Sequence, residues 1–200
     1  MLKRYTLGQV FYLIYCVIRS KLISKNIRLI RFPIDIRGGR FISFGKKFTS
    51  GKRCRIEVEV STDNTCKSKR LFFGKNIQIN DDVHITANEK VVIGDNVLIA
   101  SKVYISDCSH GSYGRNDVHD HPQSIPKDRM IYSSPVIIKK NVWLGEHVSV
   151  LMGVTIGEGS IIGANSVVSK DIPAYAIAVG VPAKVIKKFN FETQKWETVT

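Results

Sequence analysis

The sequence predicts an all-β protein, a solenoid of short strands wound into three-sided coils, with a helix at its N-terminus and one long excursion loop. Three observations support this: a strict six-residue repeat over residues 138–173, a helix-capping motif near residue 7, and an interruption of the repeat over 106–135. A period of six fits neither an α-helix, which repeats at 3.6, nor a single strand, which repeats at 2. It fits coils in which each side contributes one short parallel strand.

The strict block, Ile138 to Pro173, divides into six hexads with no residue left over. The first position of every hexad is Ile, Leu or Val, and the fifth is Val, Ser or Ile. We therefore expect both positions to point into the coil and three hexads to complete one turn. Successive turns should stack about 4.8 Å apart. Glycine occupies the second position three times, where we expect it to tolerate unusual backbone angles at a corner.

The predicted first unit, residues 1–35, is an apolar and basic helical segment. Thr6 to Gln9 has the form of a capping box, so a helix should begin near Leu7. Every residue from Val10 to Ile18 is apolar or aromatic, but this run is shorter than the roughly 20 residues that span a bilayer. Two compatible interpretations remain open. The helix caps the open end of the solenoid, or it lies on the inner face of the plasma membrane beside anionic lipid.

The charge of the chain is concentrated in this N-terminal third. The 30 Lys and Arg against 17 Asp and Glu give a net charge of +13, and residues 1–70 hold 17 of the basic groups but only four of the acidic ones. This excess directs one end of the molecule towards something anionic. The chain shows no cleavable signal sequence, so we expect a reducing, cytoplasmic location. Its cysteines also lack metal-binding spacing; they are Cys16, Cys54, Cys66 and Cys108.

The predicted second unit, residues 36–187, carries the repeat. Before the strict block the hexad signal is weaker, is interrupted by a polar stretch at 62–70, and slips by two residues around Glu89. It then disappears into the excursion loop, 106–135. A structureless loop of that length in a compact domain is usually functional. Residues 188–200 are predicted to be a polar C-terminal tail.

Three histidines lie in the excursion. Histidine is the side chain best suited to take a proton from a hydroxyl near neutral pH. His110 lies just where the chain leaves a coil, whereas His119 and His121 lie in the middle of the loop. A rigid coil should therefore hold His110 better than the other two.

Several features of the second unit occur in one order: 92–100, His110, 141–145, 153–157, 162–173 and 180–186. Together they resemble the hexapeptide-repeat O-acetyltransferases of the galactoside and maltose acetyltransferase type, over about residues 72–187. The resemblance extends to acetyltransferases of bacterial lipopolysaccharide, capsule and exopolysaccharide assembly, which commonly have extra N-terminal segments. It implies a left-handed parallel β-helix and a homotrimer that binds acetyl-CoA between adjacent prisms.

The same resemblance implies roles for individual residues. His110 corresponds to the catalytic histidine of the family, and Asn80 to an asparagine that contacts the acceptor sugar. Asn88 stands where the family has an acceptor-side carboxylate, and this change argues against a simple galactoside. Six residues match the acetyl-CoA side: Trp143, Glu146, Ala164, Ser169, Lys184 and Lys187. The two lysines would neutralise coenzyme phosphates, whereas Glu146 replaces a small polar residue and would contribute through its backbone N–H.

These features predict acetyl-CoA-dependent O-acetylation of a sugar hydroxyl in a cell-envelope polysaccharide or its lipid-linked precursor. His110 would remove the hydroxyl proton during attack on the thioester, and a backbone N–H near Gly145 or Glu146 would stabilise the oxyanion. Direct transfer needs no acetyl-enzyme. Nothing marks Cys108 as an activated nucleophile, so we expect it to be a bystander.

Several alternatives stay open at this stage. Transfer to a sugar amine, a free sugar or serine would use His110 in the same way. A zinc hydro-lyase on the same fold needs three converging imidazoles, and His84 and His147 fall on outward positions without a third partner, so we expect no metal site. A non-catalytic scaffold or a nucleic-acid binder would suit the charge, but aromatic residues are not interleaved for base stacking. The expected partners are a glycan acceptor, acetyl-CoA, further copies of the chain and anionic membrane.

Overall fold

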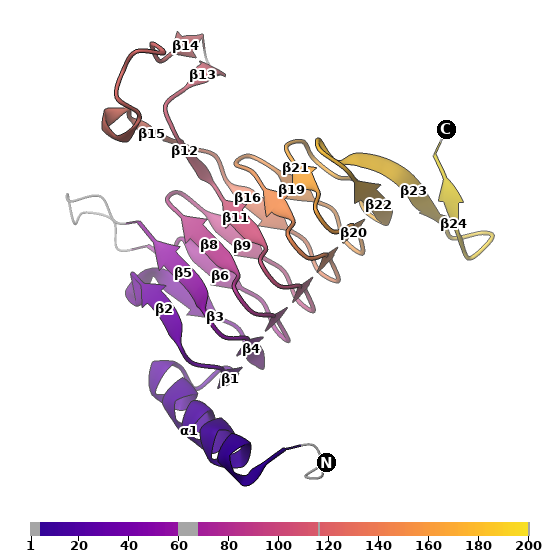
Figure 1. Cartoon of the computed structure of the whole chain (residues 1–200). Coiled ribbons are helices and arrows are strands. Elements are labelled where there is room, and N and C mark those ends of the chain that lie inside the picture. Colours follow the sequence, from indigo (N-terminus) through magenta and orange to yellow (C-terminus); the bar gives the residue numbers. More distant parts are fainter. Residues whose placement is uncertain (1–4, 60–67, 116, 200) are drawn as a thin grey trace.

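A computed structural model describes residues 5–59, 68–115 and 117–199, and it has the predicted architecture (Figure 1). Three sheets, which we call A, B and C, form the sides of a prism. Sheet A contains β1 (Ile27–Ile30), β4 (Phe48–Ser50), β7 (Gln78–Ile79), β10 (Leu98–Ile99), β17 (Trp143–Leu144), β20 (Ile161–Ile162), β22 (Ala176–Val179), β23 (Lys184–Asn190) and β24 (Lys195–Thr198). Sheet B contains β2 (Ile34–Arg37), β5 (Cys54–Val58), β8 (His84–Ala87), β11 (Tyr104–Ser106), β18 (Ser149–Val150) and β21 (Val167–Val168). Sheet C contains β3 (Ile42–Phe44), β6 (Leu71–Phe73), β9 (Val91–Ile93), β16 (Val136–Ile138) and β19 (Thr155–Ile156), and a 3-10 turn, η2 (Gly39–Phe41), precedes it. The strands of the three sheets pair in parallel, except that β23 pairs antiparallel with β22 and β24.

The six-residue repeat has the structural meaning that was predicted for it. All first and all fifth positions of the strict block are buried. Ile138 pairs with Ile156, which lies 18 residues and therefore three hexads further along the chain. Each inward side chain thus stacks on its equivalent in the next turn, and one continuous core fills the prism.

Glycine has a different role at the corners from the one expected. The unusual angles occur at fourth positions, where φ lies between 56° and 78°; these residues are Asn141, His147, Gly153, Gly159 and Asn165. The second-position glycines instead permit close packing of coils. A Cβ at Gly145 would lie 2.7 Å from the backbone N of Ala164, and one at Gly157 would lie 2.2 Å from that of Ala174. These glycines are therefore required for contact between turns and not for an unusual φ.

The irregularities of the repeat share one edge of the prism, between sheets B and C, which we call the BC edge. Phe73 and Ile93 pair at a separation of 20, across the slip at Glu89. Ile93 and Ile138 pair at a separation of 45, across the excursion. The polar stretch at 62–70 also falls between a strand of sheet B and one of sheet C, although most of it, with Cys66, lies outside the described residues. Insertions that share a face of a solenoid commonly form its binding surface.

The excursion has secondary structure, contrary to expectation. β12 (Cys108–His110) pairs antiparallel with β15 (Ile131–Ser133), and β13 (Tyr113–Arg115) pairs with β14 (Val118–His119). A 3-10 turn, η3 (Pro126–Asp128), precedes β15. Figure 1 shows this arm projecting from the end of β11, well away from the body of the solenoid.

Asp107 fixes the base of the excursion. Its side chain is fully buried, and its carboxylate accepts hydrogen bonds from three successive backbone N–H groups, those of Asn88, Glu89 and Lys90, at 2.7 to 2.8 Å. A buried carboxylate needs such partners because an unpaired buried charge costs several kcal/mol. The two-residue slip therefore forms the turn whose N–H groups bind the Asp107 carboxylate. Asp107 lies three residues before His110.

Helix α1 (Leu7–Ile23) begins as predicted, with both hydrogen bonds of the Thr6–Gln9 capping box. It caps the N-terminal end of the solenoid, which is one of the two interpretations given for it. The Ser20 hydroxyl accepts a hydrogen bond from the Ile30 N–H at 2.7 Å, and the Tyr12 hydroxyl donates one to the carbonyl of Phe32 at 2.6 Å. Within the described ranges, α1 and every other helix are too short or too polar to cross a bilayer.

The elements at both ends differ from the expected unit boundaries. The solenoid begins at β1, inside the segment 1–35, and the boundary expected at 188 falls inside β23. β23 and β24 form an antiparallel hairpin that extends sheet A. Trp196 packs edge-on against Phe189 with ring centroids 5.3 Å apart. The C-terminal residues therefore form part of the sheet rather than a tail.

We predict that Asp107→Asn destabilises the protein by about 2–4 kcal/mol, because an amide cannot accept hydrogen bonds from three N–H groups without placing its own N–H₂ against a donor. Urea unfolding measures the loss, and faster hydrogen exchange at Asn88, Glu89 and Lys90 locates it. Asp95→Asn is the matched control, since the Asp95 side chain accepts one backbone N–H, that of Lys75. Equal losses in the two variants would contradict the role given to Asp107.

Candidate active site

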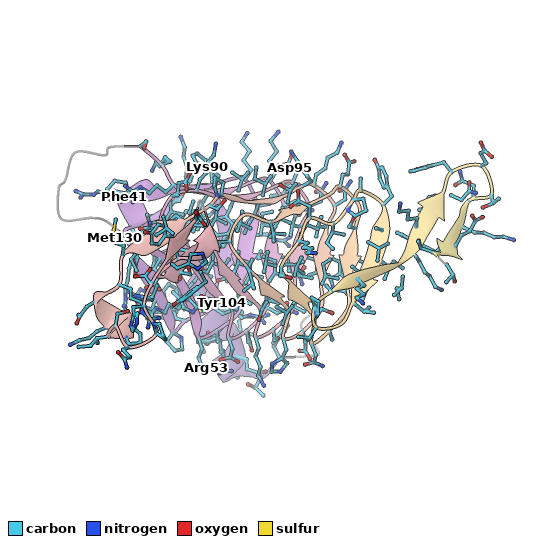
Figure 2. The ribbon with its side chains drawn as sticks, turned by 90° about the horizontal axis from the view of Figure 1, so that it is seen from above. Phe41, Arg53, Lys90, Asp95, Tyr104 and Met130 are labelled. Atoms are coloured by element: carbon cyan, nitrogen blue, oxygen red, sulfur yellow. The ribbon has the colours of Figure 1, made fainter. Side chains whose placement is uncertain are left out.

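The predicted site residues lie on two edges of the prism and on the outer face of sheet A. Asn88, His110 and Ser169 lie at the BC edge. A second group lies at the edge between sheets A and B, the AB edge: Asn80, Glu146 and Ala164. In Figure 2, Lys90 marks the BC edge and Arg53 the AB edge, with Tyr104 of sheet B between them. The structure therefore brings the predicted residues together in two groups, separated by the width of sheet B.

The remaining acetyl-CoA candidates lie on sheet A. Trp143 pairs with Ile161, Ile161 with Ile177, and Ile177 with Lys187, so that Trp143 and Lys187 belong to one row across four strands. Trp143 is 48% exposed. Lys184 is the first residue of β23 and is also exposed. Sheet A therefore offers an exposed aromatic ring and two lysines, of which Lys187 belongs to this row and Lys184 pairs with Val179 beside it.

The excursion holds the backbone of His110 and leaves its ring open. His110 pairs with Ile131 of β15, and its carbonyl accepts a hydrogen bond from the Tyr113 hydroxyl at 2.7 Å. Arg129 donates to that hydroxyl at 2.7 Å and to Ser124 at 2.8 Å. The imidazole is exposed in the single chain. The backbone of His110 is therefore held while its side chain is accessible.

The other histidines of the excursion are placed differently. His119 is exposed on β14. His121 Nδ1 accepts a hydrogen bond from the Gln123 N–H at 3.3 Å, which gives it a role in a turn. In the part of the chain that the structure describes, no three His, Cys, Asp or Glu side chains are grouped so that they could hold a metal ion.

The surroundings of Cys108 disfavour its thiolate form. Burial raises its pKa, and the negative charges of Asp107, Glu59 and Glu57 add to this effect, while a hydrogen bond with Ser106 opposes it. A raised pKa lowers the fraction of thiolate, which is the nucleophilic form.

Asn88 is partly structural. Its side-chain N–H₂ donates to the Ser133 hydroxyl of β15, and its carbonyl accepts a hydrogen bond from Arg70 at 2.7 Å. The departure from the family carboxylate thus coincides with a contact that holds the base of the excursion. Asn88 remains half-buried at the BC edge.

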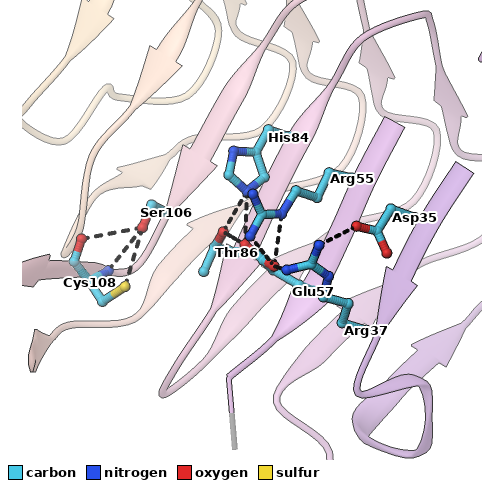
Figure 3. A network of polar contacts seen from close by, with 8 residues as sticks. All are labelled: Asp35, Arg37, Arg55, Glu57, His84, Thr86, Ser106 and Cys108. Atoms are coloured by element: carbon cyan, nitrogen blue, oxygen red, sulfur yellow. Dashed lines mark hydrogen bonds and ion pairs between the residues drawn. The ribbon is translucent and has the colours of Figure 1, made fainter. Parts of the chain in front are cut away.

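Between Asn80 and Asn88, sheet B carries a polar network that the sequence did not predict (Figure 3). Glu57, on β5, is 6% exposed. Its carboxylate lies 3.0 Å from His84 Nε2 and accepts hydrogen bonds from Thr86 at 3.0 Å and Arg55 at 2.9 Å. The ring of Tyr104 lies 5.4 Å from that of His84 on the next strand.

The contacts of Glu57 determine its charge state. Burial raises its pKa, but hydrogen bonds from His84, Arg55 and Thr86 outweigh burial, so that the pKa is lowered overall. Glu57 is therefore a carboxylate at neutral pH and orients the His84 ring through Nε2. Because residues 57 and 84 belong to different turns, only the strand register brings them together.

We predict that Glu57→Gln lowers the free energy of unfolding by about 1–3 kcal/mol at neutral pH, because three donors lose a charged acceptor. A lowered folded-state pKa means that the stabilisation is present above the usual titration range of glutamate and is lost as the pH falls through the lowered pKa. Urea unfolding should show the largest difference between variant and wild type near neutral pH and a smaller one in acid. Glu89→Gln, at an exposed position, is the control; a difference for Glu57→Gln that does not depend on pH would exclude the ionic interaction.

Comparison with known proteins identifies the architecture. Residues 135–170 match the family described as bacterial transferase hexapeptide (six repeats). The chain is 45% identical over 195 residues to the putative lipopolysaccharide biosynthesis O-acetyl transferase WbbJ of Escherichia coli (strain K12), with 98% of this chain and 96% of that protein covered.

Two similar solved structures contain coenzyme A. Galactoside acetyltransferase in complex with coenzyme A is 30% identical, covers 87% of this chain and 71% of its own, and gives a TM-score of 0.54. A variant of AntD, an N-acyltransferase from Bacillus cereus in complex with dTDP-4-amino-4,6-dideoxyglucose and coenzyme A, is 25% identical, with 84% of each chain covered and a TM-score of 0.66. Because the similarity to WbbJ spans nearly the whole of both proteins, the chain belongs to the hexapeptide-repeat acetyltransferases, left-handed parallel β-helix enzymes that use acetyl-CoA as the acyl donor.

Proposed function

We propose that the protein transfers the acetyl group of acetyl-CoA to a hydroxyl of a sugar in a cell-envelope polysaccharide or its lipid-linked precursor. The observation that carries this proposal is the extent of the similarity to WbbJ, which includes the basic N-terminal third as well as the repeat. A small free sugar would not require that third. The proposal therefore concerns an acceptor that is large, anionic or held at a membrane.

His110 is the proposed general base. Its imidazole accepts the proton of the acceptor hydroxyl as the oxygen attacks the thioester carbonyl carbon; the C–S bond then breaks, and the imidazolium protonates the departing coenzyme A thiolate. The Gly145 N–H is already donated to the carbonyl of Ile162 at 2.8 Å. Gly145 is therefore excluded as the oxyanion donor, and the proposal retains the backbone N–H of Glu146.

The proposed site lies between copies of the chain in a homotrimer. In one chain, His110 at the BC edge is separated by sheet B from the acetyl-CoA candidates at the AB edge and on sheet A, and Ser169 is the one acetyl-CoA candidate at its own edge. A neighbouring prism would bring its own AB edge to the excursion. The excursion exposes apolar side chains suited to such a contact, including Met130 at 72% and Ile125 at 58%.

We predict that His110→Ala lowers kcat for acetyl transfer by about 10²–10⁴-fold, the range expected for loss of a general base. Release of free thiol from acetyl-CoA, measured with a panel of free and lipid-linked glycans, gives the rate. Thermal stabilisation by coenzyme A should be kept, because the ring is not part of the proposed coenzyme contacts. His119→Ala, in the same excursion, is the matched control. A His110→Ala enzyme with more than a tenth of wild-type activity would disprove the assignment.

Transfer to an amine is the second candidate, since AntD is an N-acyltransferase in complex with an amino sugar nucleotide. His110 would accept a proton from the ammonium or amine in the same position. The products separate the two reactions, because an acetyl ester is cleaved by mild base and an acetamide is not.

We further propose that α1 lies on an anionic membrane. The face opposite the docked one carries an apolar stripe at helical spacing whose members are at least 46% exposed: Leu7, Phe11, Ile14, Tyr15, Ile18 and Leu22. Beside it, five cations line one shallow depression: Lys21, Lys25, Arg28, Lys46 and Lys47. An apolar stripe next to a basic cluster is the arrangement that binds interfaces of anionic lipid.

Phe11→Ser combined with Ile18→Ser is expected to reduce binding to vesicles of phosphatidylcholine and phosphatidylglycerol at least tenfold, because two exposed apolar side chains no longer enter the lipid. Co-sedimentation at low salt measures this. Val199→Ser, an exposed apolar position at the other end of the solenoid, should have no effect. Wild-type protein that stays in the supernatant under these conditions would rule out the membrane contact.

A further inference from the structure

We propose that a cavity at the AB edge binds the phosphate or diphosphate group of a lipid-linked acceptor; this inference rests on the proposed function and specifies its substrate. The cavity measures about 460 Å³, within the range of small-molecule sites. It lies against β1, β4 and β7, the turns that follow them and the turn that follows β10, and its polar lining residues include Arg28, Arg31, Thr49, Gln78, Asn80 and Ser101.

The charge of the lining favours an anion. Arg28 and Arg31 both line the cavity, and guanidinium groups bind phosphate oxygens in a bidentate manner. Asp81 is the acidic residue in the lining. Its carboxylate oxygen Oδ1 already accepts a hydrogen bond from the Lys52 N–H at 2.8 Å, which partly offsets its negative charge. Two arginines and several amide and hydroxyl groups thus face the same space.

The cavity shares lining residues with the cleft beside α1 and with the basic depression. Arg31 also lines a cleft beside α1, together with Tyr12 and Leu13 of that helix. Arg28 also belongs to the basic depression described above. Asn80, which the family resemblance assigns to the acceptor sugar, lines the cavity itself.

The surface therefore presents an apolar helix, two arginines and a sugar-contacting amide in succession. A lipid-linked sugar presents the same groups in the same succession: lipid, phosphate, sugar. A free polysaccharide has no lipid or phosphate to contact the helix and the arginines. A membrane phospholipid has no sugar to contact the amide. This match is the reason that we assign the cavity to the phosphate of the acceptor and not to a phospholipid head group.

The test uses full-length protein and three probes: inorganic pyrophosphate, farnesyl diphosphate, and vesicles of phosphatidylcholine and phosphatidylglycerol. Calorimetry at low salt measures the first two, and co-sedimentation the third. Arg28→Gln combined with Arg31→Gln should weaken pyrophosphate and farnesyl diphosphate binding at least tenfold. Lys139→Gln combined with Lys195→Gln removes the same charge from exposed positions elsewhere and should change either affinity less than twofold.

The helix variant separates lipid from phosphate. Phe11→Ser with Ile18→Ser should weaken farnesyl diphosphate binding but leave pyrophosphate affinity unchanged. The proposal is overturned if the arginine variant affects only the vesicles, which would assign the arginines to phospholipid head groups, or if the lysine variant weakens pyrophosphate binding equally, which would reduce the effect to net charge. Unchanged thermal unfolding of each variant excludes a folding defect.

His110→Ala keeps this test independent of the proposed function. It should lower acetyl transfer by about 10²–10⁴-fold and retain pyrophosphate affinity within twofold. Wild-type protein that releases no thiol with any glycan would contradict the proposed reaction and leave the binding result intact. Wild-type protein that acetylates a glycan but binds neither diphosphate would contradict the cavity alone.

Discussion

The hydrogen bonds between the Asp107 carboxylate and three consecutive backbone N–H groups are the interaction on which the position of the excursion depends. A buried carboxylate is tolerated only with such partners, and each charge-assisted hydrogen bond adds geometric specificity to the contact between Asp107 and the turn at 88–90. The partners belong to one turn and the carboxylate to the next. Two separate interruptions of the repeat therefore meet at one point, and the backbone of His110 takes its position from that point.

The core of this protein could be predicted from sequence because its packing is periodic. Burial at the first and fifth hexad positions recurs every six residues, so Ile138 and Ile156 report the same environment. The capping box at Thr6 was equally local. The strands of the excursion were missed because partners far along the chain hold them, as Arg129 holds Tyr113 across 16 residues. Glu57 and His84 were missed for a similar reason: their contact depends on a register that is set by an insertion between their strands.

The two edges of the prism on either side of sheet B carry different features: insertions at the BC edge and the cavity at the AB edge. Insertions at the BC edge do not disturb the core, since the strands on either side resume the same pairing after 20 or 45 residues. The AB edge keeps short turns and carries the cavity with Asn80. Sheet B, with the Glu57 network, lies between the two edges (Figure 3). Substrate preference can therefore change at either edge without cost to the hydrophobic interior.

The two ends of the prism have a further consequence. A stack of parallel coils has no intrinsic stopping point, because each terminal strand presents free N–H and C=O groups to another chain. Here α1 covers one terminus, where Ser20 satisfies the Ile30 amide, and the antiparallel hairpin of β23 and β24 changes the hydrogen-bonding pattern at the other. Neither end of sheet A is therefore open to a further parallel strand, which works against end-to-end polymerisation along this sheet.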